Sequence, residues 1–355
     1  MVWRGSDPAA GACRPLTGRR LRIAALLAGA LFLAAPVQAQ TMTQEEKEHS
    51  ALAPTAMTAT PSTKPEEDIV VKGKPEPKPA EVREEAHAIT RNSVKYSTPL
   101  AKFQAEVCPG VVGMPVDMAG IIIDRIRVNA ERVGMQTAPL GHCTPNILVI
   151  FVRNGQAVIK ELHKKQDYIF KRISLADVKE LIADPGPVHA WTNTEVRSRQ
   201  GDVLQGDNDS VDLEALPVLN VGQSQSHIFL AARLDISNSI IMIDIPAING
   251  MAVVQIADYV TMRTFAMTNP VSGDPAATTI LSLFDADAPH PRELTDFDLA
   301  YLRTVYGGLD SLNAASKLAS INGKLRGVQA EKLALKADRE APADPSAPAP
   351  ADGKP

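Results

Sequence analysis

The stretch from residue 238 to residue 269 constrains the fold more than any other part of the chain. Its uninterrupted apolar run from Ile240 to Ile245 predicts a buried strand. Residues 246–250, which include a proline and a glycine, predict a turn, and residues 251–267 predict a largely buried helix. A strand that leads directly into a buried helix indicates a domain in which helices pack on a sheet. We therefore expect an α+β fold with a mixed sheet packed on helices.

The first 39 residues have the pattern of a secretory signal peptide. A basic segment, Arg14 to Arg22, precedes an apolar run from Ile23 to Ala35, and Val37-Gln38-Ala39 forms a small-x-small cleavage pattern. We expect Sec-type export, cleavage after Ala39, and a periplasmic or secreted protein. Twin-arginine export is not expected, because glycine stands where serine or threonine is usual before the paired arginines.

Charge and hydropathy restrict the possible partners. The chain has 355 residues and a net charge of −4; without residues 1–39 it has 32 basic and 40 acidic residues, a net charge of −8. An acidic chain has no global reason to bind nucleic acid or an anionic membrane. No apolar run reaches the roughly 20 residues that a membrane span requires. We expect no membrane span, and a protein or a cell-envelope component as the partner.

Composition also predicts the domain plan. Residues 40–97 are rich in Pro, Glu and Lys without an apolar period, which predicts a disordered linker that extends as polyproline II. Residues 98–335 predict a single globular domain. Residues 336–355, rich in Ala and Pro, predict a disordered tail.

Two cysteines, Cys108 and Cys143, follow the predicted signal peptide. An even pair in an oxidising compartment predicts a disulfide. Such a bond would close a loop of about 36 residues and stabilise the fold by roughly 4 kcal/mol in the chain-entropy description. A metal pair or a reactive thiol is the alternative, but neither cysteine has a suitable partner nearby in the sequence.

Periodicity predicts the other elements of the globular region, and Ser174 and Thr295 are the predicted N-caps of the helices that follow them. Helices are expected at 115–132, 156–165, 175–183, 296–306 and 311–335, the last kinked at Gly323, and a short helix or turn at 276–284. Strands are expected at 146–152 and 188–199, and a hairpin at 226–234 and 239–245 with its turn at 235–238.

The strand at 188–199 carries a candidate binding surface. Its period-two alternation places Trp191, Glu195 and Arg197 on one face. Such a face either binds a ligand or is a solvated face with cross-strand ion pairs. Residues 206–210, GDNDS, are similar to an acidic calcium loop, but the ligand spacing is wrong for an EF-hand. No calcium site is expected there.

The order of parts from Asn146 to Gly307 resembles a zincin of the metzincin kind. Members of that family have a mixed sheet, a helix bearing HExxHxxGxxH, a methionine turn and a closing helix. Here ADYVTMRTF at 257–265, ILSLF at 280–284 and LTDFDLAYLRTVYG at 294–307 fall at the corresponding places. Residues 100–330 also resemble an uncharacterised family of secreted bacterial proteins with the same layout, which implies no known activity.

The zinc-binding motif itself is absent. The resemblance places Ala257 and Thr261 where the first two zinc histidines would stand, and Asp258 where the general-base glutamate would stand. These residues cannot supply the three protein ligands of a catalytic zinc. We therefore expect a degenerate zincin-like domain, a pseudoenzyme with no catalytic residues, no metal and no cofactor.

The same helix also has a purely structural interpretation. Val253, Ile256, Ala257, Val260 and Phe265 form an apolar surface, and a more polar stripe consists of Gln255, Tyr259 and Arg263. The histidines of the globular region, His142, His163, His189, His227 and His290, are scattered singly and are expected to be surface or capping residues.

Three functions are compatible with these observations. The first is a non-catalytic zincin-like binding or scaffold module. The second is an envelope structural or assembly factor, suggested by the long linker and the polar last helix. The third is a hydrolase with a non-zinc site, whose candidate acids are Asp258, Glu195 and Asp298, with Arg197 or Arg263 as charge stabilisers. No GxSxG, Cys–His or phosphate-loop signature supports the third.

Overall fold

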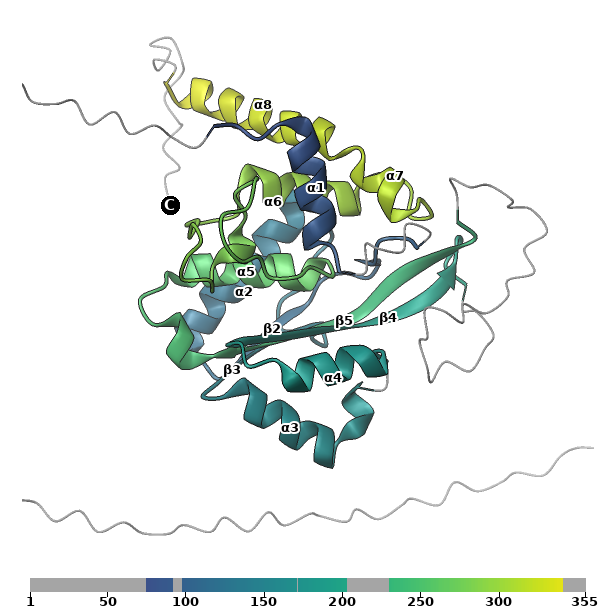
Figure 1. The fold of residues 1–355 in the computed structure, drawn as a ribbon, viewed down its shortest axis with the longest axis vertical. Coiled ribbons are helices and arrows are strands. Elements are labelled where there is room, and N and C mark those ends of the chain that lie inside the picture. Colours follow the sequence, from purple (N-terminus) through teal and green to yellow (C-terminus); the bar gives the residue numbers. More distant parts are fainter. Residues whose placement is uncertain (1–74, 92–97, 171, 203–229, 341–355) are drawn as a thin grey trace, which may run out of the picture. The chain divides into compact units, whose positions relative to one another are not determined.

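The computed structural model describes residues 75–91, 98–170, 172–202 and 230–340. The predicted signal peptide, most of the predicted linker, the acidic loop at 206–210 and nearly all of the predicted tail lie outside these residues. The described residues form three layers, a mixed sheet with helices on both of its faces (Figure 1). This architecture agrees with the predicted α+β class.

The long strand β5 (Ala232–Asp244) is the centre of the sheet. Along one side it pairs in antiparallel fashion with β4 (Val188–Ser198). Along its other side it pairs in parallel, first with β1 (Lys102–Phe103) and then with β3 (Ile147–Val152). The short β2 (Pro109–Val112) completes the sheet by pairing in parallel with β3.

The predicted hairpin at 226–245 is wrong over its described part. Residues 235–238 continue β5 instead of turning, because their polar side chains find partners within the sheet. Asp235 pairs with Arg233, Asn238 accepts a hydrogen bond from Asn193, and Ser237 donates to the Asn193 carbonyl. A register irregularity in β4 after Asn193 accommodates this polar step.

One face of the sheet carries α2 (Val116–Arg132) and α5 (Val253–Phe265), and beyond them α6 (Asp296–Tyr306) and α8 (Ile321–Glu340) (Figure 1). The opposite face carries α3 (Gly155–Lys165) and α4 (Leu175–Ala183), joined through the 3-10 turn Asp167–Phe170. The remaining short elements are α7 (Ala314–Leu318) and two further 3-10 turns, Ile245–Ile248 and Ile280–Ser282.

The prediction of disorder throughout 40–97 is wrong for its last part. Residues Pro79–Ile89 form helix α1, and Val82, Ala86 and Ile89 are buried in the main core. The backbone after α1 bonds to the chain that follows α5, through Arg91 N to Met267 O at 2.7 Å and Asn269 N to Ile89 O at 2.7 Å. A short apolar set at 82, 86 and 89 suffices for a helix that lies against an existing core.

The predicted helix caps are confirmed. Ser174 accepts from the Asp177 amide, and Thr295 and Asp298 form a reciprocal capping box at the start of α6. The expected kink in the last helix is a break at Ala319–Ser320 instead, where α7 ends and α8 begins, and not at Gly323.

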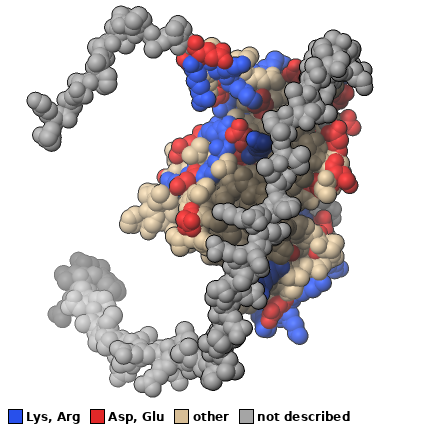
Figure 2. Space-filling view, turned by 90° about the vertical axis from the view of Figure 1, so that its left-hand side faces the viewer, with Lys and Arg blue, Asp and Glu red and all other residues tan. Residues whose placement is uncertain are grey.

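Each face of the sheet has its own apolar core. The larger core lies between the sheet and α1, α2, α5 and α6, and the smaller lies under α3 and α4 around Trp191, Phe170 and Met242. No helix in the described ranges is both long and apolar enough to cross a membrane. Figure 2 shows acidic and basic side chains intermixed over the face that it presents.

Candidate functional site

The helix at the position of the zincin motif is buried on all sides. From Ile256 to Phe265 every residue of α5 is buried, because the helix lies between the sheet and the outer helices. Ala257, Asp258 and Thr261 each have no exposed surface. Ala257, Asp258 and Thr261 therefore face other side chains.

Asp258 is held by four hydrogen bonds. Its Oδ1 accepts from Arg125 Nε at 2.7 Å and from Asn129 Nδ2 at 2.7 Å. Its Oδ2 accepts from Arg125 Nη2 at 2.7 Å and from the Leu294 amide at 2.8 Å. Both carboxylate oxygens are thus saturated, and no acceptor site is left for a water or a metal.

This cluster connects three segments of the chain. Arg125 and Asn129 come from successive turns of α2, Asp258 from α5, and Leu294 from the segment before α6. Asn129 also donates to Thr261 Oγ1 at 3.1 Å, and Thr261 donates in turn to the Ala257 carbonyl. The hydrogen bond and charge of Asp258 raise the pKa of Arg125 above its usual value. Removing one partner of such a buried pair typically costs about 3–5 kcal/mol.

Sequence reasoning missed the α2 half of this cluster. The signal was present as a polar pair four residues apart, Arg125 and Asn129, next to the apolar stripe of a helix, together with one aspartate in a buried helix. A buried carboxylate requires a cation or several hydrogen-bond donors, and Arg125 with Asn129 on α2 supplies both.

The more polar stripe on α5 is largely buried. Tyr259 and Arg263 are 1% and 7% exposed. The Arg263 guanidinium carbon lies 6.0 Å from the centre of the Tyr259 ring, and burial raises the pKa of Tyr259. Arg263 Nε and Nη1 have no hydrogen-bond partner among the described residues.

His189 is buried as well, against the prediction that the histidines are surface or capping residues. It lies at the start of β4 with 1% exposure, and burial lowers its pKa. Its Nδ1 is 3.8 Å from Asp184 Oδ2, and neither ring nitrogen is hydrogen-bonded within the described chain. The prediction holds for His142 and His290, which are exposed.

The candidate binding surface on β4 divides into two parts. Trp191 is 4% exposed and packs against Phe170, with ring centres 5.6 Å apart, so it belongs to the smaller core and not to a surface. Glu195 is accessible and lies between Arg172 and Arg197, bonding to both. The Arg172 pair joins β4 to the segment before α4, and the Arg197 pair lies within β4, so neither is the cross-strand ion pair that the structural interpretation predicted. Both pairs lower the pKa of Glu195, with the Arg197 bond as the largest cause.

A pocket of about 410 Å³ opens beside these ion pairs. Its floor consists of Leu148 from β3 and Ile240 from β5, and Tyr168, Ile169 and Arg172 line it on the helical side. Asn193 on β4 lines it next to Asn238. The pocket therefore lies between the sheet and the α3–α4 layer, on the face opposite the zincin-like positions.

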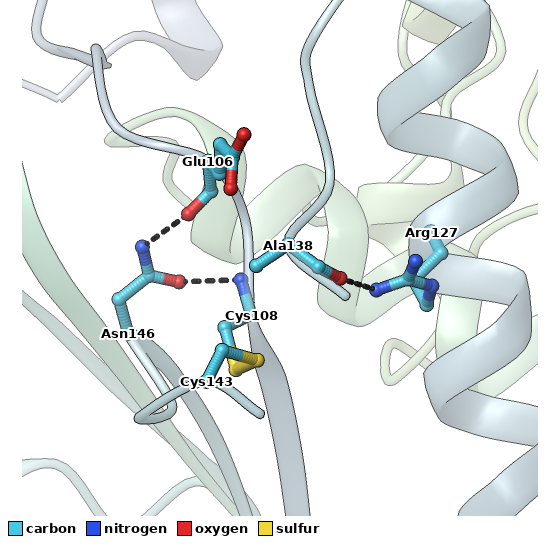
Figure 3. Close-up of a disulfide and its surroundings, with 6 residues drawn as sticks. All are labelled: Glu106, Cys108, Arg127, Ala138, Cys143 and Asn146. Atoms are coloured by element: carbon cyan, nitrogen blue, oxygen red, sulfur yellow. Dashed lines mark hydrogen bonds between the residues drawn. A yellow bond between two sulfur atoms is a disulfide. The ribbon is translucent and has the colours of Figure 1, made fainter. Parts of the chain in front are cut away.

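The predicted disulfide is present and supports one wall of this pocket. Cys108 and Cys143 are bonded, with Cα atoms 6.2 Å apart. Figure 3 shows Asn146 beside the disulfide, where its side chain donates to the Glu106 carbonyl at 2.9 Å and accepts from the Cys108 amide at 2.8 Å. Arg127 of α2 donates to the carbonyl of Ala138, which lies in the segment between α2 and Cys143. Asn146 lines the pocket, so this wall is fixed by both covalent and hydrogen bonds.

The other candidate acid, Asp298, has a structural role too. It is fully buried and accepts from Thr279, the Ile280 amide, and both the amide and hydroxyl of Thr295. Burial raises its pKa to about 6 in spite of these bonds. In the part of the chain that the structure describes, no three His, Cys, Asp or Glu side chains are grouped closely enough to hold a metal ion.

Comparisons with protein-family models, with curated proteins and with solved structures found no match for this chain.

Proposed function

We propose that the protein is a secreted or periplasmic binding module, built on a zincin-like domain in which the former catalytic helix has become structural. The observation that carries the non-catalytic part is the saturation of Asp258 by Arg125, Asn129 and the Leu294 amide. A general base must reach a water or a substrate proton, and Asp258 reaches neither.

The arrangement of the chain around α5 supports the zincin-like part of the proposal. A sheet strand, β5, leads through one 3-10 turn into the buried helix, and a capped helix, α6, follows. The predicted signal peptide and the Cys108–Cys143 disulfide support the location, because disulfides persist in oxidising compartments.

Metal content and proteolysis of the purified chain, residues 40–355, test this proposal. After dialysis against zinc and removal of excess, we expect far less than one zinc per chain by elemental mass spectrometry. We also expect no chelator-sensitive cleavage of casein or of a mixed-peptide substrate. One tightly bound zinc per chain, together with chelator-sensitive cleavage, would overturn the proposal. Thr261→Val keeps the shape of the side chain and replaces only its hydroxyl with a methyl group. Cleavage that is unchanged in this variant would show that the activity lies elsewhere in the protein.

An envelope assembly factor is the second candidate, and one feature favours it. Helix α8 has only Ile321 and Val328 buried, and its last part exposes Leu333 and Leu335 to 68% and 54%. Leu333 and Leu335 are two residues apart on the helix, so they lie on different faces and each offers a partner a separate apolar side chain. In vivo crosslinking from position 335, with Leu333→Glu as the disrupting variant, would identify a stable partner if this candidate holds.

The hydrolase alternative has the least support. Asp258 and Asp298 are both inaccessible, and Glu195 is neutralised by two arginines. Arg263 is buried in the interior of the fold, and it forms no hydrogen bond with any of these three acids among the described residues.

A further inference from the structure

We propose that Asn249 is a site of spontaneous covalent modification, at which the side-chain amide is lost and an aspartate or an isoaspartate is formed. The residue precedes Gly250 in the connection between β5 and α5. This inference goes beyond the proposed binding role and does not depend on it, because it concerns the chemistry of the chain itself. It follows from the different environments in which the fold places identical dipeptides.

The reaction needs only neighbouring groups of the chain and water. The backbone nitrogen of the residue after an asparagine loses its proton to hydroxide and attacks the side-chain Cγ. A bond forms between that nitrogen and Cγ, the bond from Cγ to Nδ2 breaks, and the amide nitrogen takes a proton from water and leaves as ammonia. Water then opens the cyclic imide at either carbonyl, which gives aspartate or isoaspartate. A following glycine favours the attack because it has no Cβ to obstruct the nitrogen.

The chain contains three Asn-Gly pairs, at 154–155, 249–250 and 322–323, and the structure describes all three. Because the dipeptide is the same, the local sequence predicts similar reactivity at each pair. The attack requires an available backbone N–H at the glycine and an asparagine side chain that can turn toward it. Where hydrogen bonds or packing hold these groups, the site must open locally before it reacts.

Asn154 is held at both reacting groups. Its side-chain oxygen accepts from the Ala157 amide at 2.8 Å, as the N-cap of α3. The Gly155 N–H donates to Asp244 Oδ1 at 2.5 Å, and Gly155 is buried. A Cβ at Gly155 would be 2.7 Å from His189 Cδ2, so the backbone there is tightly enclosed. This pair is therefore protected.

Asn322 is held by its helix. It lies in the first turn of α8, where the Gly323 N–H donates to the Ser320 carbonyl at 3.0 Å. Asn322 Nδ2 donates to the carbonyl of Pro79 at 2.9 Å. The attacking nitrogen and the leaving amide are thus both bonded, and the reaction would require the start of α8 to unwind.

Asn249 lacks these restraints. Asn249 and Gly250 are both exposed, and neither the Asn249 side chain nor the Gly250 N–H forms a hydrogen bond with a described residue. Asn249 has φ −60° and ψ 125°, and Gly250 has φ 83°, which are the values of a type II turn. The Met251 N–H closes this turn by donating to the Ile248 carbonyl at 3.1 Å.

This turn leaves the reaction little to overcome. Ring closure requires rotation about ψ of Asn249, which brings the Gly250 nitrogen toward Cγ. Within the described chain, the bond between Met251 and Ile248 is what holds the turn closed. A Cβ at Gly250 would meet nothing within 4 Å, so the glycine has room to move. At Asn249 one turn must open, whereas a capped helix end or a helical turn must open at the other two pairs.

The product alters the link between the sheet and the buried helix α5. Each conversion replaces a neutral amide with a carboxylate, which adds a negative charge to the exposed turn. The isoaspartate form also routes the backbone through the former side chain and lengthens it by one carbon. The modified protein therefore differs from the original in both charge and backbone at this turn.

Peptide mapping by mass spectrometry tests the inference. Residues 40–355 would be incubated in native buffer at mildly alkaline pH, and samples taken over time would be scored for conversion at each Asn-Gly pair. We expect Asn249 to convert at least about tenfold faster than Asn154 and Asn322. The same chain in concentrated urea is the matched control, because it keeps the three dipeptides and removes the fold. There the three rates should be similar.

Asn249→Gln is the control variant. Glutamine would have to close a larger and less favourable ring, so conversion at position 249 should stop while Asn154 and Asn322 keep their native rates. Circular dichroism would confirm that the variant is folded. Fragmentation that separates aspartate from isoaspartate should find both products at position 249 of the original chain, because the cyclic imide opens in two directions.

Three results would overturn the inference. The first is conversion of native Asn249 that is no faster than that of the two protected asparagines. The second is a ratio of the three rates that is the same in native buffer and in urea, since the fold would then play no part. The third is aspartate without isoaspartate, which would exclude the cyclic route. All three leave the zinc and proteolysis test of the proposed function unaffected.

Discussion

Arg125 and Asp258 are 133 residues apart in sequence and form a two-point ion pair, with both N–O distances at 2.7 Å. The guanidinium retains 21% side-chain exposure, and the carboxylate has none. The pair fixes α2 against α5, and the Leu294 amide on the same carboxylate adds the segment before α6. One buried charge thus positions three segments at once.

Replacing Asp258 by Ala should lower the free energy of unfolding by about 3–5 kcal/mol, because Arg125 and the Leu294 amide lose their buried partner. Chemical denaturation measures this. Glu293→Ala is the control, since Glu293 contacts Arg125 at 3.4 Å and is 70% exposed; it should change stability by less than about 1 kcal/mol. Equal effects of the two changes would contradict the role given to Asp258.

Replacing Lys317 by Met should stabilise the protein. Lys317 is 3% exposed with no hydrogen-bond partner for Nζ in the described residues, and nearby Asp310 is already bonded to Lys102 and Gln104. Burial lowers the pKa of Lys317 to about 8, so protonation of Lys317 favours the unfolded chain. The penalty is complete below pH 8 and disappears above the unfolded pKa of about 10.4.

We therefore expect Lys317→Met to gain about 2–3 kcal/mol at pH 7 and less than about 1 kcal/mol at pH 10. Urea denaturation at both pH values measures the gains. If the two gains are the same, packing and not charge is responsible.

Asp298 should make the fold less stable as the pH rises from 4 to 7. Its pKa of about 6 in the folded protein exceeds the ordinary value, so the stabilising contribution is complete below about pH 4 and is lost as the pH rises through 6. The difference in unfolding free energy between Asp298→Asn and the wild type should move in the variant's favour by about 2–3 kcal/mol over this range. Asp296→Asn on the same helix should show no such trend.

Gly113 and Gly134 provide a matched pair of substitutions. Both have positive φ, 85° and 83°. A Cβ at Gly113 would be 2.1 Å from the Phe151 carbonyl oxygen, whereas a Cβ at Gly134 meets nothing within 4 Å. Gly134→Ala should cost about 1 kcal/mol from backbone strain alone. Gly113→Ala should cost clearly more, and thermal denaturation of the two variants would show whether the contact with β3 is as close as described.

Reducing the Cys108–Cys143 disulfide should lower the free energy of unfolding by roughly 4 kcal/mol, by freeing a loop of 35 residues in the unfolded chain. Denaturation with and without reductant measures this, and the Cys108→Ala/Cys143→Ala variant should be insensitive to reductant.

Local signals in the sequence predicted much of the fold. The apolar run Ile147–Val152, the caps Ser174 and Thr295, and the buried segment around α5 are properties of short stretches, and their boundaries agree closely with the structure. The disulfide followed from counting cysteines in a predicted oxidising compartment.

The errors arose where a distant partner decides the structure. Asp235 and Asn238 resembled a turn because their partners in the strand were unknown. Helix α1 has few apolar residues, and it is stable because these residues pack into a core formed by residues later in the chain. His189 was predicted to be a surface or capping residue because nothing near it in the sequence shows what covers it. The pocket likewise depends on three strands and a turn meeting, which no single stretch encodes.

The packing of α1 against α8 has a consequence for the order of folding. Asn322 bonds to the Pro79 carbonyl and Gln329 to Glu76, so the first described helix rests on the last one, more than 240 residues later. Contacts of such long range form late, because the entropy lost on closing the loop is not offset until both contacting segments are present. In a chain that emerges from its amino terminus, α1 would therefore gain its contacts near Met267 first and would lack its contacts with α8 until residue 329 has arrived.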